Sequence, residues 1–100
     1  MNANELTKLW ASIEEVINAP TKKEAKPLVS RLKFQASQIK ANINDPYFRN
    51  KLDEVIIYAE EASGRVMNKI EAESYVKQSW YTFESGVKTH NKNEETNNLP

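Results

Sequence analysis

Apolar side chains recur every three or four residues through most of this chain, and that spacing constrains its fold more than any other feature. The period matches the 3.6 residues of an α-helical turn, so each run places its apolar residues on one side of a helix. Leu6, Leu9, Ile13 and Val16 share such a side. The pattern predicts four amphipathic helices, over residues 5–18, 22–43, 46–63 and 69–87.

A change of phase near Gly64 separates the last two helices. On one helical wheel, the stripe through Val76 and Trp80 lies about 100° from the stripe through Leu52 and Val55. A single long helix would therefore have to bury two different sides. Gly64 is also the residue type that most readily ends a helix in the left-handed conformation.

Residues 66–71 are expected to form the corner between these two helices. Asn68 and Glu71 match a capping box, in which each side chain satisfies a free backbone amide of the other residue. Val66, Met67 and Ile70 are apolar, and we expect them to fill the corner.

Two further helix starts carry local signals. Thr21 and Glu24 match a capping box, and Asp45 followed by Pro46 matches an N-cap acid with proline at the first helical position. Pro27 leaves two alternatives: a helix that kinks there, or a short turn followed by a helix that begins there.

We predict a single all-α domain, an up-down four-helix bundle over residues 1–88. One hundred residues suit one core, and short connections favour antiparallel neighbours. The polar segment 89–100 has no apolar stripe and is expected to be a disordered C-terminal tail.

Composition argues against several kinds of chemistry. The chain has no cysteine, and its single histidine, His90, falls in the expected tail, where nothing would orient an imidazole. Its two glycines, Gly64 and Gly86, form no phosphate-binding loop. We therefore expect no enzyme, no metal site and no cofactor.

The sequence also suggests where the protein resides. No basic segment followed by an apolar run opens the chain, and no apolar stretch approaches the roughly 20 residues of a transmembrane helix. We expect a soluble cytoplasmic protein without a transmembrane segment. Lysine outnumbers arginine eleven to three and asparagine occurs eleven times, a bias of AT-rich genomes that suggests a bacterium or a phage.

A lysine stripe is expected on the second helix. Lys22, Lys26, Lys33 and Lys40 project within about 40° of one another if that helix is continuous. The stripe predicts either an anion-binding face, for nucleic acid or an anionic membrane, or a solvated face beside acidic neighbours. The net charge of zero, from 14 basic and 14 acidic residues, weakens the nucleic-acid interpretation.

The third helix carries the opposite charge on its outward side. Asp53, Glu54, Glu60 and Glu61 surround Ile57, which points away from the buried stripe. Single exposed apolar residues are common. An apolar anchor ringed by charge is nevertheless how many small recognition sites are built, so we predict that these five residues bind a partner.

Phe34 is a second apolar residue outside its stripe. It lies opposite the core side of the second helix, among the uncharged residues Ser30, Ser37, Gln38 and Ala41. Such surroundings suit packing against a helix of another protein or of a second copy. The alternative is that Phe34 covers a neighbouring helix of the same bundle.

These features favour a non-catalytic protein–protein interaction module that acts through exposed faces of the second and third helices. Small inhibitors, immunity-type proteins, chaperones and adaptors belong to this class. The alternative function is nucleic-acid or anionic-surface binding through the lysine stripe.

Overall fold

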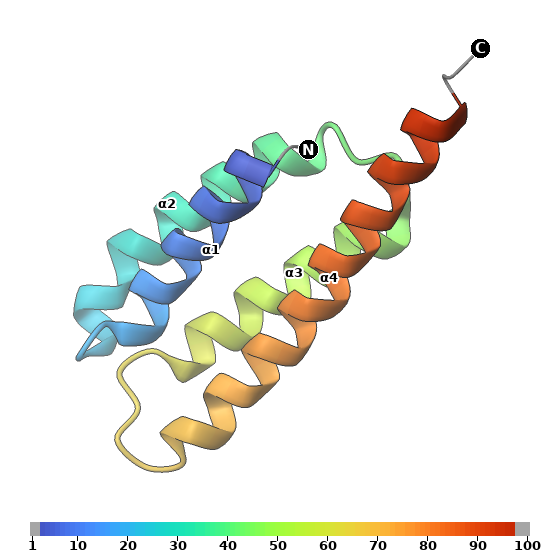
Figure 1. The fold of residues 1–100 in the computed structure, drawn as a ribbon. Helices are drawn as coiled ribbons and strands as arrows, with labels where there is room; N and C mark the ends of the chain where they lie inside the picture. Colours follow the sequence, from blue (N-terminus) through green and yellow to red (C-terminus); the bar gives the residue numbers. More distant parts are fainter. Residues whose placement is uncertain (1–2, 98–100) are drawn as a thin grey trace.

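The computed structural model describes residues 3–97 of the chain, and the side chains of residues 3–89. Within this part the chain forms four α-helices and no β-strand (Figure 1). The helices are α1 (Ala3–Asn18), α2 (Lys22–Lys40), α3 (Pro46–Ala62) and α4 (Lys69–Asn97). The predicted all-α, four-helix fold is confirmed.

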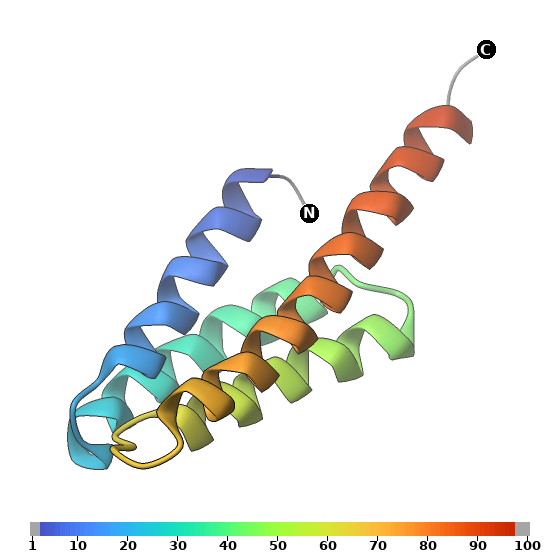
Figure 2. The same ribbon diagram turned by 60° about the horizontal axis from the view of Figure 1, so that its bottom comes forward.

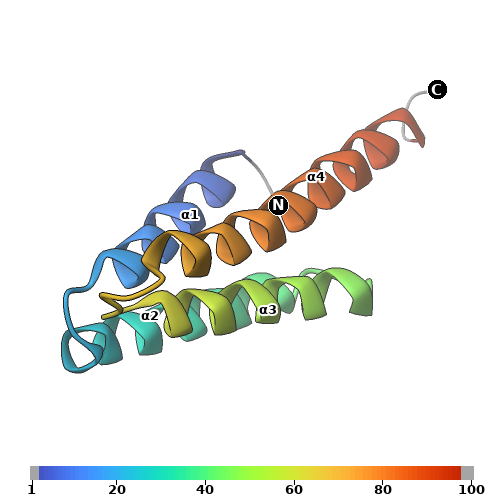
Figure 3. The ribbon, with the colours of Figure 1, turned by 90° about the horizontal axis from the view of Figure 1, so that it is seen from below.

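The helices run alternately up and down as two antiparallel hairpins, α1–α2 and α3–α4 (Figure 1). Seen from below, α1 and α4 lie in one layer and α2 and α3 in the other (Figure 3). Helix α3 is central, because it packs against each of the other three helices. Helices α1 and α4 diverge toward the N-terminus of α1 (Figure 2).

Each helix contributes one apolar stripe to a single core, as the spacing predicted. Leu9, Ile13, Leu32, Leu52 and Phe83 are among the largest side chains that the core buries completely. Burial of such side chains supplies most of the stability of a helix bundle, since each contributes about 1.5–3 kcal/mol.

A pair of tryptophans joins the diverging helices α1 and α4. The ring centroids of Trp10 and Trp80 lie 5.3 Å apart, with the ring planes tilted by 32°. Trp80 is buried and Trp10 is half-buried. The pair therefore closes the core on the side where the two backbones move apart.

The local signals at two helix ends are confirmed, and the capping box of Thr21 and Glu24 is confirmed for the bond that Thr21 accepts. Thr21 caps α2, and its hydroxyl accepts a 3.1 Å hydrogen bond from the amide of Glu24. Asp45 caps α3 just before Pro46, and its carboxylate accepts a 2.9 Å bond from the amide two residues on. Gly64 follows α3 with a φ of +66°.

Pro27 lies inside α2, which is one helix from Lys22 to Lys40. The alternative in which the helix begins at Pro27 is therefore wrong. Because α2 is continuous, its four stripe lysines share one side of the helix.

Two helix ends differ from the sequence pattern. Helix α2 ends at Lys40 rather than at residue 43. After Lys40 the amides of Asn42 and Ile43 donate to the carbonyls three residues before them, which tightens the chain into a turn. The backbone of α4 continues past Val87 to Asn97. Side chains from His90 onward, and residues 98–100, lie outside the described part, so the tail expected over residues 89–100 stays a prediction.

The α1–α2 turn and the α3–α4 loop meet at one end of the bundle. The amide of Gly64 donates a 3.0 Å hydrogen bond to the carbonyl of Ala19. A Cβ atom at Gly64 would lie 2.7 Å from the backbone nitrogen of Lys22. Both the positive φ and this close approach require glycine.

Lysine amines cap the carbonyl ends of α1 and α3 at the same place. Lys69 Nζ donates to the carbonyl of Ile17 and, at 2.7 Å, to that of Ala62. Lys22 Nζ donates to the carbonyl of Glu60 at 2.5 Å. Cations here add charged donors to helix-end carbonyls, two of which also accept bonds from Ser63 and Arg65, and they offset the helix dipole. We call the contacts of Gly64, Lys69 and Lys22 the seam.

The residues expected to fill this corner are exposed instead. Val66, Met67 and Ile70 are 91%, 78% and 86% exposed, so the prediction that they fill the corner is wrong. The seam already occupies the corner with backbone groups and lysine stems. The capping box of Asn68 and Glu71 is also wrong, because Asn68 has a φ of +58° rather than the extended backbone of an N-cap.

The variant Gly64→Ala is expected to lower the free energy of unfolding by about 2–5 kcal/mol. Alanine costs about 1–2 kcal/mol in the left-handed conformation, and overlap of its Cβ with the α1–α2 turn adds about 1–3 kcal/mol. Urea unfolding followed by tryptophan fluorescence measures the change.

The matched control is Ser30→Ala, an exposed position of α2 that should change the free energy of unfolding by no more than about 0.5 kcal/mol. An unfolding midpoint for Gly64→Ala equal to that of the control would contradict the role given to the seam.

Candidate functional site

Four of the charged residues predicted to bind partners meet across the contact between α2 and α3. Lys33 Nζ lies 3.6 Å from Glu60 Oε2, and Lys40 Nζ lies 2.6 Å from Asp53 Oδ1. The lysine stripe of α2 and the acidic side of α3 therefore meet across the helix pair. Each partly neutralises the charge of the other.

Lys22 and Lys26 complete the lysine stripe. Lys22 Nζ donates to the carbonyls of Glu60 and Glu61 and, at 3.2 Å, to the hydroxyl of Ser63. Within residues 3–89, Lys26 forms no ion pair, and it lines a small hollow with Lys22 and Ser63. Three of the four stripe lysines thus contact their own chain, and anion binding by the stripe stays a prediction.

Ile57 lies on α3 between the two acids that pair with α2. Asp53 is about one turn before it, Glu60 about one turn after it, and its side chain is 54% exposed. Lysines from α2 hold both acids. Ile57 is therefore an apolar spot between two interhelical ion pairs.

The other two predicted acids lie along α3 about one turn before and one turn after Ile57. Glu54 Oε2 accepts a 3.1 Å hydrogen bond from Lys51 Nζ along α3, and this bond raises the pKa of Lys51. Glu61 is exposed and forms no ion pair among the side chains that the structure describes. Glu61 is thus the one predicted acid whose charge no described cation neutralises.

Phe34 is 66% exposed on the side of α2 that faces away from the core. The ion pairs set Lys33 opposite Glu60 and Lys40 opposite Asp53. In that antiparallel register Phe34 and Ile57 differ in level by two residues, or about 3 Å along the helix axes. We call the two apolar residues and the two ion pairs between them the α2–α3 face.

The neighbours of Phe34 are small or uncharged, as the sequence predicted. Ser30, Ser37, Gln38 and Ala41 are all exposed. The Ser37 hydroxyl donates a 2.9 Å hydrogen bond to the carbonyl of Phe34, which turns this polar group back onto its own helix. Burial of Phe34 against a partner would therefore remove no charged neighbour from water among these four residues.

A shallow hollow on the outer side of α1 is a feature that the sequence did not reveal. It has a volume of about 700 Å³. Its lining consists of Thr7, Trp10, Ala11, Glu14, Glu15, Asn18, Ala19 and Leu28. Because Leu28 comes from α2, no pattern within one helix could have predicted this surface. We call it the α1 hollow.

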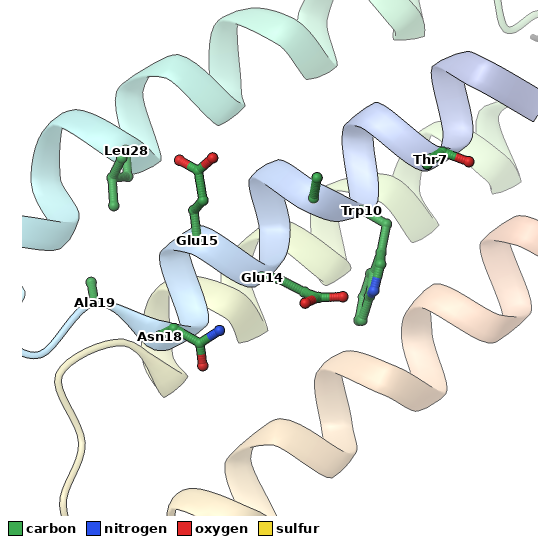
Figure 4. A pocket seen from close by; sticks show the side chains of 8 residues that line it. Thr7, Trp10, Glu14, Glu15, Asn18, Ala19 and Leu28 are labelled. Atoms are coloured by element: carbon green, nitrogen blue, oxygen red, sulfur yellow. The ribbon is translucent and has the colours of Figure 1, made fainter.

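The α1 hollow combines apolar side chains with two carboxylates. Figure 4 shows Glu15 and Leu28 projecting into the gap between α1 and α2, whereas Glu14 lies on the other side of α1, near Trp10. Neither glutamate forms an ion pair within the described residues. The hollow is therefore acidic as well as apolar.

Val66, Met67 and Ile70 form a third surface, which we call the apolar knob. Sequence reasoning assigned these residues to the core because they are apolar and lie at a corner. One signal could have indicated otherwise: Val66 and Met67 are adjacent in a short loop after Gly64, where helical periodicity no longer specifies an inward side.

Neither a metal-ligand cluster nor a membrane-spanning helix occurs in the part of the chain that the structure describes. Within it, no three His, Cys, Asp or Glu side chains lie close enough together to hold a metal ion. No described helix is both long enough and apolar enough to cross a membrane. The side chain of His90 lies outside the described part.

Comparison with known proteins identifies no family. The sequence matches no protein-family model, and neither a curated protein nor a solved structure is significantly similar to it.

The ion pair of Lys40 and Asp53 is expected to contribute a coupling free energy of about 0.2–1 kcal/mol, because both side chains remain partly exposed to water. A double-mutant cycle with Lys40→Ala and Asp53→Ala, measured by urea unfolding, gives this quantity. The longer and more exposed pair of Lys33 and Glu60 should give a smaller coupling.

High salt is the control for this cycle. The coupling of Lys40 to Asp53 should fall toward zero in about 1 M salt, where the screening length is about 3 Å. No measurable coupling at low salt would show that this ion pair does not fix the register of α2 against α3.

Proposed function

We propose that this protein is a non-catalytic protein–protein interaction module whose partner binds the α2–α3 face. The observation that carries the proposal is Ile57, an isoleucine 54% exposed between two interhelical ion pairs. An apolar anchor inside a rim of charged side chains is the usual arrangement of a small recognition site.

Phe34 supports the proposal as a second anchor at nearly the same level. Burying an aromatic and an aliphatic side chain in a partner would contribute about 1.5–3 kcal/mol for each. The intervening charges are already paired within the chain, so a partner that covers them removes no isolated charge from water.

Small inhibitors, immunity-type proteins, chaperones and adaptors all work in this way, without chemistry of their own. The proposal includes a cytoplasmic location in a bacterium or a phage-infected cell, which the absence of cysteine and the lysine and asparagine bias support. Asp53, Glu54, Glu60 and Glu61 would form the rim of the site. Glu61, the acid that no described cation neutralises, would favour a basic residue on the partner.

The variants Phe34→Asp and Ile57→Asp are expected to reduce partner recovery at least about tenfold, since each places a charge where an apolar anchor should be buried. The measurement is affinity capture from a lysate of the source organism, with the captured protein quantified by mass spectrometry. The helical circular dichroism signal should not change.

The matched control is Gln78→Asp, which adds the same charge at an exposed position of α4. It should leave recovery unchanged. Equal recovery with all three variants would overturn the proposal. A loss of more than about 2 kcal/mol of stability in Ile57→Asp would show instead that Ile57 belongs to the core.

Nucleic-acid binding through the lysine stripe is the second candidate function. Lys26 favours it, because no described acid pairs with this residue. The engagement of Lys22, Lys33 and Lys40 within the chain argues against it. We therefore expect no binding of a labelled duplex or single strand in fluorescence anisotropy at about 50 mM salt, where nonspecific binding is strong.

Binding at that salt concentration with a steep fall at higher salt would contradict this expectation. The variant Lys26→Ala would then locate the contact. The slope of its log binding constant against log salt concentration should be smaller in magnitude by about one.

A further inference from the structure

A hollow between the end of α3 and the start of α4 combines aromatic rings with charges of both signs. It has a volume of about 290 Å³. Its lining includes Tyr58, Tyr75, Glu61, Glu71, Arg65 and Asn68, and we call it the tyrosine hollow. The volume is near the lower limit for ligand pockets, which suits a ligand of about the size of an amino acid.

The two tyrosines stack across the helix pair. The ring centroids of Tyr58 on α3 and Tyr75 on α4 lie 5.7 Å apart, with the ring planes 24° from parallel. Tyr58 is half-buried, and Tyr75 is 48% exposed. The pair therefore forms an aromatic wall that a ligand can reach from solution.

The tyrosine pair also sets the level of the two glutamates. Glu61 follows Tyr58 by three residues and Glu71 precedes Tyr75 by four, so each glutamate lies about one turn from its tyrosine on the same side of its helix. Because α3 and α4 are antiparallel, both glutamates lie at the loop end of the tyrosine pair (Figure 1). Their levels differ by one residue, or about 1.5 Å along the helix axes. The hollow thus has a glutamate on each of its two helices at nearly the same level.

Arg65 and Asn68 line the hollow from the loop between the helices. The Nε of Arg65 donates a 2.9 Å hydrogen bond to the carbonyl of Glu61, which leaves the terminal nitrogens of the guanidinium with no ion pair among the described residues. The carbonyl of Asn68 accepts a 3.0 Å hydrogen bond from the amide of Ala72, so the backbone of this loop residue is also held. From the loop toward the helices, the hollow offers a cation, then two carboxylates, then two aromatic rings.

The charged groups of the hollow do not neutralise one another. Within residues 3–89, neither Arg65 nor Glu61 nor Glu71 belongs to an ion pair. The lining carries one positive and two negative charges. A ligand that balances these charges has one carboxylate and two cationic groups.

We propose that the tyrosine hollow binds a free basic α-amino acid such as arginine. The ligand's α-carboxylate would pair with Arg65, its α-ammonium would lie between Glu61 and Glu71, and its guanidinium would lie against the tyrosine pair. In arginine these three groups follow in the same order as their partners in the hollow. The site includes neither Phe34 nor Ile57, so it is independent of the function proposed for the α2–α3 face.

A divalent metal ion and a polyamine fit the hollow less well. Glu61 and Glu71 are the two acids of the lining, and no described cluster has the three ligands that hold a metal ion. The guanidinium of Arg65 would repel either cation and would gain no partner from it. A ligand with a carboxylate converts this repulsion into an ion pair.

Titration of the isotopically labelled full chain with L-arginine, followed by the NMR chemical shifts of its amides, tests the site. Binding should be saturable with a dissociation constant of about 0.1–10 mM, because each exposed ion pair contributes little free energy. The amides that shift should cluster within residues 58–75, which include every residue of the lining.

Three analogues each remove one group of the ligand. Agmatine lacks the carboxylate, and Nα-acetyl-L-arginine lacks the α-ammonium, as an arginine at the C-terminus of a peptide does. Both should bind about tenfold more weakly than L-arginine. L-citrulline has a neutral side chain of similar shape and should bind about two- to fivefold more weakly, the usual contribution of an exposed cation–π contact.

Variants of the hollow should give matching losses. Arg65→Gln should bind L-arginine no more tightly than agmatine, because the carboxylate has lost its partner. Glu61→Gln combined with Glu71→Gln should weaken L-arginine binding about tenfold. Tyr75→Leu keeps an apolar side chain without an aromatic face, so it should remove the preference for L-arginine over L-citrulline.

The matched controls are Arg31→Gln and Glu14→Gln, which make the same changes at exposed positions of α2 and α1 and should bind L-arginine as the wild type does. No saturable shift within residues 58–75 up to about 50 mM L-arginine would overturn the proposal. Equal binding of agmatine would overturn it as well, because the hollow would then recognise a cation alone. Equal binding of Nα-acetyl-L-arginine would contradict a free amino acid and indicate the C-terminus of a peptide instead.

Discussion

The free carbonyls at the ends of α1 and α3 are the constraint on which the rest of this fold depends. Four helices of this length bury their stripes only if both hairpins close at the same end, and there the last carbonyls of two helices come together. Lys69 reaches from the start of α4 to carbonyls of both helices. Lys22 adds a second amine to the end of α3. Among the described residues the carbonyl of Ile17 accepts no bond other than that of Lys69, whereas the carbonyls of Glu60 and Ala62 also accept bonds from Ser63 and Arg65.

The seam also determines which residues are left exposed. Gly64 brings the α3–α4 loop within hydrogen-bond distance of Ala19, so the corner contains backbone and lysine stems rather than apolar side chains. Val66 and Met67 are displaced outward as a result. The most exposed large apolar side chains among residues 3–89 are thus a consequence of the way in which the closed end of the bundle is built.

The features that depend on residues near one another in sequence were predictable. The apolar stripes, the cap at Thr21 and the left-handed Gly64 each follow from a few adjacent residues, and each agrees with the structure. The wheel also placed Phe34 and Ile57 on outward sides correctly. Local rules succeed here because helix geometry relates neighbouring residues directly.

The features that depend on distant residues were not predictable in the same way. A helical wheel says that Lys33 and Glu60 point outward, but not that their helices are neighbours that bring the two charges together. The contact of Lys69 with Ile17 spans 52 residues, and nothing in either segment indicates it. Val66 was misassigned for the same reason, because its exposure depends on contacts made by residues on either side of it.

If lysine amines on helix-end carbonyls hold the two hairpins together, the variant Lys69→Met should destabilise the fold, because it removes the amine that reaches both α1 and α3. Methionine keeps an unbranched stem but cannot donate a hydrogen bond. The free energy of unfolding should fall by about 1.5–3 kcal/mol, the usual contribution of hydrogen bonds to a charged group. Lys77→Met, at an exposed position of the same helix, should change it by less than about 0.5 kcal/mol. Equal urea midpoints for the two variants would contradict the account.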